Sequence, residues 1–135
     1  MWQTPKTNWT NSDRFNMEDY NRIKNNLRYL WEEVCDMWQE FEIEDMGEDI
    51  TSYKQNYNFV YFNAFESNVD IINKNMFTQN YGMRQNFYPN GVFIKFDELN
   101  RIESAILKMK QIIDGKKAGM KRLPFRLGAP KGLYL

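Results

Sequence analysis

Hydrophobic residues recur at the same spacing in three separate segments of the chain. Within each segment the apolar side chains are three or four residues apart, which is the period of one face of an α-helix. The pattern predicts helices over residues 17–41, 59–76 and 96–114. The segments between them are rich in turn-forming and aromatic residues. The chain is therefore predicted to be mainly α, a three-helix bundle in a single domain of residues 1–135 with long aromatic loops.

The three helical segments align with one another, which indicates an internal repeat. The aligned segments begin at Tyr20, Phe62 and Leu99. Three residues after each start lies an apolar core position, occupied by Ile23, Phe65 and Ile102. Repeats of about 40 residues are typical of proteins in which each unit needs its neighbours to bury its apolar face. Such units build scaffolds and binding surfaces more readily than active sites.

Asparagine follows the first residue of each aligned segment, at Asn21, Asn63 and Asn100. Asparagine is a mediocre helix former because its side-chain amide competes for backbone groups. Its recurrence at one position predicts a shared structural role. We expect each of these side chains to bond the backbone of a neighbouring segment outside its own helix.

The connections between the predicted helices are about 17 and about 19 residues long, whereas adjacent antiparallel helices usually need only two to eight. An extended stretch of 17 residues spans roughly 55 Å. A helix of about 25 residues is only roughly 38 Å long. The connections can therefore run back along a helix, so a parallel arrangement of three arm-plus-helix units around a pseudo-threefold axis stays open. The plain antiparallel bundle is the alternative.

Turn and capping residues mark the ends of the predicted elements. The first 15 residues look extended, and Asn16 can cap the first helix. Gly115 predicts the end of the third helix. Residues 92–94 are predicted as a short strand, and residues 121–135 as a C-terminal β-hairpin.

Composition removes several classes of function. The chain has no histidine, which is the commonest general base and metal ligand, and its 18 basic residues balance 18 acidic ones. A single cysteine, Cys35, rules out an internal disulfide and is predicted to be buried and inert. No apolar run is long enough to cross a membrane. We expect no catalytic residue, cofactor or metal, and no nucleic-acid or membrane partner.

Charge is segregated along the chain. Residues 32–49 hold nine acidic residues and no basic one, and residues 108–131 hold eight basic residues and one acidic one. These blocks are either solvated surfaces or complementary faces for head-to-tail contact between subunits. The acidic residues at 42–49 do not have the spacing of an EF-hand, so a solvated loop is favoured over a calcium site.

Aromatic residues make up 16% of the chain and are frequent outside the predicted helices. Aromatic side chains carry large apolar areas and are enriched in protein interfaces. Either these segments wrap the bundle or they bind other chains. The candidate interface residues are Trp2, Trp9, Tyr88, Phe125 and Tyr134.

Several motifs resemble small structural proteins from the tail modules of phages and prophages of Gram-positive bacteria. The motifs are WQTPKTNW at 2–9, FNMEDYNRI at 15–23, FEIEDMG at 41–47, FYPNG at 87–91, ELNRIE at 98–103 and RLPFRLG at 122–128. The resemblance implies a virion protein of the tail, the baseplate or the fibre attachment, made in the cytoplasm of the host bacterium. It implies other tail, baseplate or fibre proteins as partners and no catalytic residues.

Three functions therefore remain open from the sequence. The first is a non-enzymatic virion protein that acts through protein–protein assembly, as a homo-oligomer or in several copies. The second is a cytoplasmic helical adaptor or interaction module unrelated to virions. The third is an enzyme or regulator whose site the sequence does not reveal.

Overall fold

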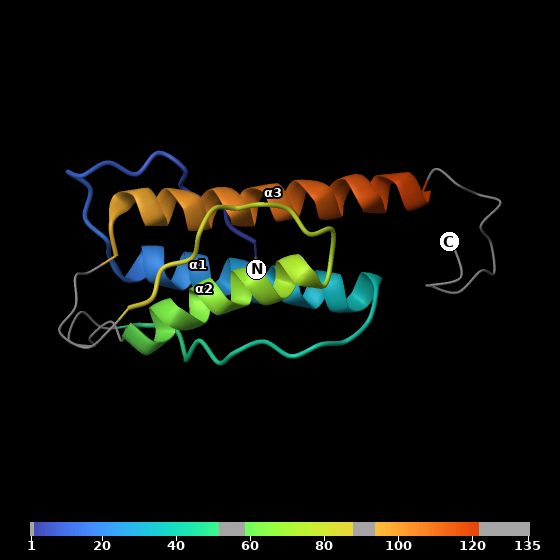
Figure 1. Cartoon of the computed structure of the whole chain (residues 1–135), viewed down its shortest axis with the longest axis horizontal. Coiled ribbons are helices and arrows are strands. Elements are labelled where there is room, and N and C mark those ends of the chain that lie inside the picture. Colours follow the sequence, from blue (N-terminus) through green and yellow to red (C-terminus); the bar gives the residue numbers. More distant parts are fainter. Residues whose placement is uncertain (1, 52–58, 88–93, 122–135) are drawn as a thin grey trace.

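Three parallel α-helices form the body of the molecule. The computed structural model describes residues 2–51, 59–87 and 94–121, and within them it has three helices and no strand. They are α1 (Met17–Met37), α2 (Phe59–Lys74) and α3 (Phe96–Lys121). All three begin at the same end of the molecule (Figure 1), and every pair of helices is in contact. The mainly α fold is confirmed, and the antiparallel alternative is wrong.

Extended segments lie against the helices. We call residues 2–10 arm 1, residues 39–51 arm 2 and residues 78–87 arm 3, and none of them contains a helix or a strand. Because the helices are parallel, the chain must travel the length of the bundle after α1 and after α2. Arm 2 does this visibly, running back from the end of α1 toward the start of α2 (Figure 1).

The core is built from the apolar stripe of each helix. The stripe residues meet in one cluster and are at most 3% exposed. They are Ile23, Leu27, Leu30 and Val34 of α1, Phe65, Val69 and Ile72 of α2, and Ile102, Ile106, Met109 and Ile113 of α3. Full burial of such a side chain contributes about 1.5–3 kcal/mol. The core therefore supplies the main driving force for bringing the helices together.

Helix α1 begins where its capping residue predicts. The Asn16 side chain accepts a hydrogen bond from the Asp19 N–H, and the Asp19 carboxylate accepts one from the Asn16 N–H, both at 3.0 Å. The helix ends at Met37, four residues before the predicted end. The chain reverses there, and the Trp31 indole N–H donates to the carbonyl of Phe41 at 2.7 Å. Phe41 therefore packs back on α1 and does not extend it.

The predicted ends of the other two helices also need correction. Helix α2 stops at Lys74, two residues early, whereas α3 passes through Gly115 and continues to Lys121. The ion pair from Lys110 to Asp114 at 2.6 Å supports α3 just before this glycine. Ile94 is not in a strand. The rest of the predicted strand, and the predicted hairpin apart from Lys121, lie outside the described residues.

The two glycines inside α3 provide a test of this extension. Apart from the adjoining residues and backbone of α3 itself, no described atom lies within 4 Å of a Cβ placed at Gly115 or Gly119. Because a helical glycine costs roughly 0.5–1 kcal/mol relative to alanine, G115A and G119A should each stabilise the protein by about that amount. Urea unfolding measures the change.

Gly82 is the matched control for those variants. It has a φ of +91°, and a Cβ there would lie 2.7 Å from Cδ of Arg101. G82A should therefore be destabilising. If G115A and G119A also destabilise the protein, α3 is not helical through these residues.

Candidate functional site

The recurrent asparagines bind the arms. Nδ2 of Asn21 donates to the carbonyl of Ile50, and Oδ1 of Asn21 accepts from the N–H of Ile50, both at 2.8 Å. We call this reciprocal contact an asparagine pair. The same contact joins Asn63 to Phe87 at 2.8 and 2.8 Å, and Asn100 to Trp9 at 2.7 and 3.0 Å. Each pair satisfies both backbone groups of one arm residue, as a neighbouring strand would.

A second set of asparagine pairs lies further along two of the helices. Asn26 pairs with Gln3 at 2.8 and 2.8 Å, and Asn68 pairs with Glu44 at 2.7 and 2.9 Å. Both asparagine side chains are fully buried. The aligned position in α3 is Ala105, which cannot make this contact. Sequence reasoning missed this set, although asparagine at one aligned position in two of three segments was a usable signal.

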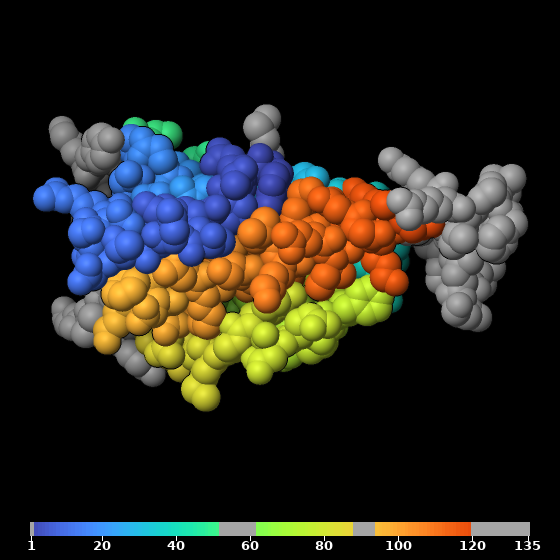
Figure 2. Space-filling model, turned by 90° about the horizontal axis from the view of Figure 1, so that it is seen from above, coloured from blue at the N-terminus to red at the C-terminus, as the bar shows by residue number. Residues whose placement is uncertain are grey.

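These pairs show which helices each arm touches. Arm 1 pairs with α1 and α3, so it lies in the groove between them, which we call groove 1. Arm 2 pairs with α1 and α2, in groove 2. Arm 3 pairs with α2, and its Gly82 packs against Arg101 of α3, in groove 3. Figure 2 shows α3 (orange) flanked by the N-terminal residues (blue) on one side and by arm 3 (yellow-green) on the other.

Groove 1 contains a buried carboxylate whose hydrogen bonds are all made within the groove. Glu103 is 0% exposed and accepts from Nε and Nη2 of Arg22 at 2.8 and 2.7 Å. It also accepts from the Lys6 N–H at 3.0 Å and from the Trp9 indole N–H at 2.6 Å. Burial alone would lower the pKa of Arg22, but its bonds to Glu103 and Asp19 outweigh burial and raise it. The guanidinium therefore stays charged, and the ion pair fastens arm 1 to two helices.

Groove 3 contains the aligned residue of α2, Glu66, which is also 0% exposed. One of its oxygens accepts from Nη2 of Arg101 and from the Gln85 N–H, the latter at 3.1 Å. Among the described residues, its other oxygen, Oε1, has no hydrogen-bond partner, and the same is true of the Tyr81 hydroxyl and of Nε of Arg84. Burial raises the pKa of Glu66 more than Arg101 lowers it. Groove 3 is therefore less completely bonded than groove 1.

Groove 2 contains a buried lysine at the same aligned position. Lys24 is 1% exposed, forms an ion pair with Asp49 of arm 2 and donates to the carbonyl of Gly47 at 3.4 Å. The hydrogen bond from Lys24 lowers the pKa of Asp49. The residue of α2 aligned with the two groove arginines is Ala64. Groove 2 therefore has no arginine–glutamate pair.

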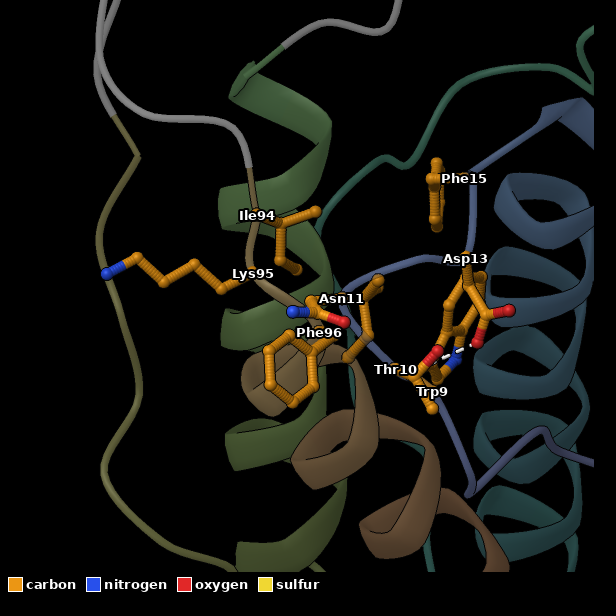
Figure 3. Close-up of a pocket in the computed structure, with 9 residues that line it drawn as sticks. Trp9, Thr10, Asn11, Asp13, Phe15, Ile94, Lys95 and Phe96 are labelled. Atoms are coloured by element: carbon orange, nitrogen blue, oxygen red, sulfur yellow. Dashed lines mark hydrogen bonds between the residues drawn. The ribbon is translucent and has the colours of Figure 1, made fainter.

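The cavities of the described residues do not converge on a catalytic group. One of about 290 Å³ lies between the turn after arm 1 and the start of α3 (Figure 3). Its side chains include the rings of Phe15 and Phe96, while Lys95 points away from the others. Asp13 accepts from the N–H of Thr10 in the turn itself, at 2.8 Å. This hollow therefore combines apolar walls with a turn that is already hydrogen-bonded.

A larger hollow of about 560 Å³ lies beside Cys35. The thiol is half-buried, so the prediction of a buried cysteine is wrong, and its sulfur lies 3.7 Å from the carbonyl of Phe41. Four exposed carboxylates share the hollow, from Glu32, Asp36, Glu40 and Glu42. An activated cysteine needs a neighbouring basic group, and none lines this hollow.

In the described part of the chain, no cluster of three or more cysteine and acidic side chains could hold a metal ion. Nor does any helix in residues 2–51, 59–87 and 94–121 have the length and apolar character needed to cross a membrane. Around the acidic 42–49 segment, Asp49 is paired with Lys24, and Asp45 accepts from the Gly47 N–H at 2.9 Å.

Of the five candidate interface residues, the structure describes Trp2 and Trp9. Trp9 is only 3% exposed and belongs to the core, so it is not part of the exposed surface. Trp2 is half-buried, with its ring 5.8 Å from that of Tyr29. Tyr88, Phe125 and Tyr134 lie outside the described residues. One ion pair between the two charge blocks lies within the chain, where Lys117 of α3 pairs with Glu33 of α1.

Two exposed aromatic side chains lie together at the far end of the bundle, and a third, Phe96, lies at the start of α3. Trp38 and Phe77 are 38% and 42% exposed and contact each other edge to face, with ring centroids 5.9 Å apart. Lys116 of α3 lies 4.5 Å from the centre of the Phe77 ring. This pair brings together residues just beyond the ends of α1 and α2.

Comparison with known proteins adds no relative. No family model matches the chain, and no curated protein or solved structure matches it either.

The asparagine pairs can be tested one at a time. N63A and N100A should each lower the free energy of unfolding by about 1–3 kcal/mol, because each removes two hydrogen bonds and leaves buried backbone groups of an arm unpaired. Asn25 is the control, since its amide bonds only the exposed Asp49 side chain at 3.2 Å. N25A should change stability by less than about 0.5 kcal/mol. Equal melting temperatures for N63A, N100A and the wild type would contradict the shared role.

The raised pKa of Glu66 predicts a dependence of stability on pH. A carboxyl with a higher pKa in the folded state than its ordinary value of 4.5 stabilises the fold below that value, and loses this contribution as the pH rises through the folded pKa. Relative to E66Q, the wild type should therefore lose stability as the pH rises from about 4.5 toward neutral. Urea unfolding at a series of pH values measures the difference. The exposed Glu48 is the control, and E48Q should follow the wild type throughout.

Proposed function

We propose that the chain is a non-enzymatic structural protein of a phage virion, located in the tail or baseplate or at the fibre attachment. It acts through protein–protein assembly with other tail, baseplate or fibre proteins. It is made in the host cytoplasm and incorporated into the particle. The proposal rests on the resemblance of its motifs and on the use that the fold makes of those motifs.

The resembling motifs supply the residues that fasten the arms. The first motif, at 2–9, contributes the backbone of Lys6 and the indole of Trp9 to groove 1. The motif at 15–23 contributes Arg22, and the motif at 98–103 contributes Glu103. Shared motifs are therefore explained most simply by a shared scaffold of arms and helices.

We further propose that the chain consists of three arm-plus-helix units around a pseudo-threefold axis. Support comes from the three asparagine pairs at one aligned position and from the buried charged residue at another. Each arm lies against the helix that follows it and against one other helix. A body with this symmetry suits a position between a threefold component, such as a fibre, and the rest of a tail.

One observation carries the functional proposal. In the described residues, the buried ionic side chains at the aligned position, Lys24, Glu66 and Glu103, each contact an arm, and none lines a described cavity. Burying a charge is costly unless it is paired. The pairing of these buried charges with the arms therefore maintains the shape of the molecule. Maintenance of a fixed shape is what an assembly protein requires.

The deciding experiment locates the protein in purified particles. We expect peptides of the chain in the mass spectrum of purified virions, and density for a parallel three-helix bundle at the tail tip, baseplate or fibre attachment. A protein that is absent from particles but co-purifies from the host cytoplasm with a non-virion partner would support the adaptor alternative. Deletion of the gene should yield particles that lack the neighbouring tail component.

A further inference from the structure

We propose that groove 1 also binds arm 1 of a second copy of this chain, so that copies join by exchanging arms. Groove 1 differs from the other two grooves in how the chain connects its arm to its two helices. In groove 2 the arm itself connects the two helices, because arm 2 leaves α1 and enters α2. Arm 3 connects α2 to α3 in the same way. No such connection joins α3 to arm 1, and Trp9 is 91 residues from its partner Asn100.

Arm 1 is therefore joined by the chain only to α1, and it is held on α3 through non-covalent contacts alone. Those contacts are the most complete of the three grooves. Groove 1 has both asparagine pairs, an arginine–glutamate pair and the indole bond of Trp9. Groove 2 lacks the arginine–glutamate pair because Ala64 stands at the arginine position. Groove 3 has Ala105 at the second asparagine position, and Asn73 at the end of α2 pairs instead with Gln79 of arm 3, at 2.8 and 2.9 Å. The carboxylate of groove 1 is therefore fully hydrogen-bonded in the groove whose arm the chain joins to only one of its two helices.

The contacts of groove 1 are specific for an extended peptide with particular side chains. Within arm 1 the groove bonds the backbone at Gln3, Lys6 and Trp9, which are evenly spaced, and it buries Pro5 and the indole. A second copy supplies this same peptide. Its arm would make every contact that the chain's own arm makes.

The segment that joins arm 1 to α1 is suited to redirecting arm 1 from its own groove toward that of a second copy. Residues 10–14 are all exposed, and Thr10 and Asp13 bond mainly to each other, at 2.8 and 3.1 Å. Exchange therefore keeps the groove contacts and reorganises only this turn. The balance between closed and exchanged forms then depends on protein concentration relative to the effective concentration of the chain's own arm. Assembly sites that hold many copies close together favour exchange.

The first experiment shortens the turn. Deleting residues 11–13 leaves four residues between Trp9 and Met17, so the arm is strained when it returns to its own groove. We expect concentration-dependent dimers or larger oligomers by sedimentation velocity, with the helical circular dichroism retained. Inserting three Gly or Ser residues at the same place is the control and should leave the protein monomeric. Adding W9A to the deletion should dissociate the oligomer, and a folded monomer at every concentration would overturn the proposal.

A second experiment covers the case in which the shortened variant does not fold. A fluorescent synthetic peptide of residues 2–16 is added to the full-length W9A chain, whose own arm has lost its anchor. The peptide should bind, and it should raise the melting temperature by several degrees. A W9A peptide, and the full-length W9A/N100A chain, should each show binding at least about tenfold weaker. Equal binding of the wild-type and W9A peptides would overturn the proposal.

Discussion

The whole arrangement depends on satisfying the backbone of extended segments that have no strand beside them. Parallel helices require connections that run the length of the bundle, and in this protein those connections lie in grooves between helices. A buried backbone N–H or carbonyl without a partner costs about as much as a lost hydrogen bond. Asparagine solves the problem because its amide offers one donor and one acceptor in the geometry of a peptide group. The asparagine pairs therefore allow a parallel bundle to form from one chain.

The buried charges make the contacts of each groove specific for one arm. A backbone pair can be made with any residue of an arm, so it does not by itself specify which arm segment enters a groove. Glu103 distinguishes arm 1 because it needs the indole N–H of Trp9 as well as Arg22. Lys24 distinguishes arm 2 because it needs the carboxylate of Asp49. The three grooves have the same plan but different charges, and this difference opposes incorrect pairing of arms and grooves.

The core residues and the recurrent asparagines could be predicted from the sequence. The contacts that form only in the tertiary structure could not. The core residues Ile23, Phe65 and Ile102 followed from helical periodicity, which directly reflects burial. Asn21, Asn63 and Asn100 were identified by their recurrence, but their partners were not, because pairing across grooves depends on tertiary structure. Lys24, Glu66 and Glu103 were missed as site residues because charged residues on a helix usually face solvent. Helix α3 passed Gly115 because a glycine costs only about 1 kcal/mol, which neighbouring contacts can offset.

The common direction of the helices gives the molecule an electrical axis. Each helix carries roughly half a positive charge at its N-terminal end and half a negative charge at its C-terminal end, and antiparallel helices would cancel these charges. Here the three dipoles add. The acidic residues Glu18 and Asp19 in the first turn of α1, and Asp97 and Glu98 in that of α3, stabilise these positive ends, whereas the first turn of α2 has no acidic residue. The two ends of the molecule are therefore electrostatically different, and any stacking of this bundle along its axis has a built-in polarity.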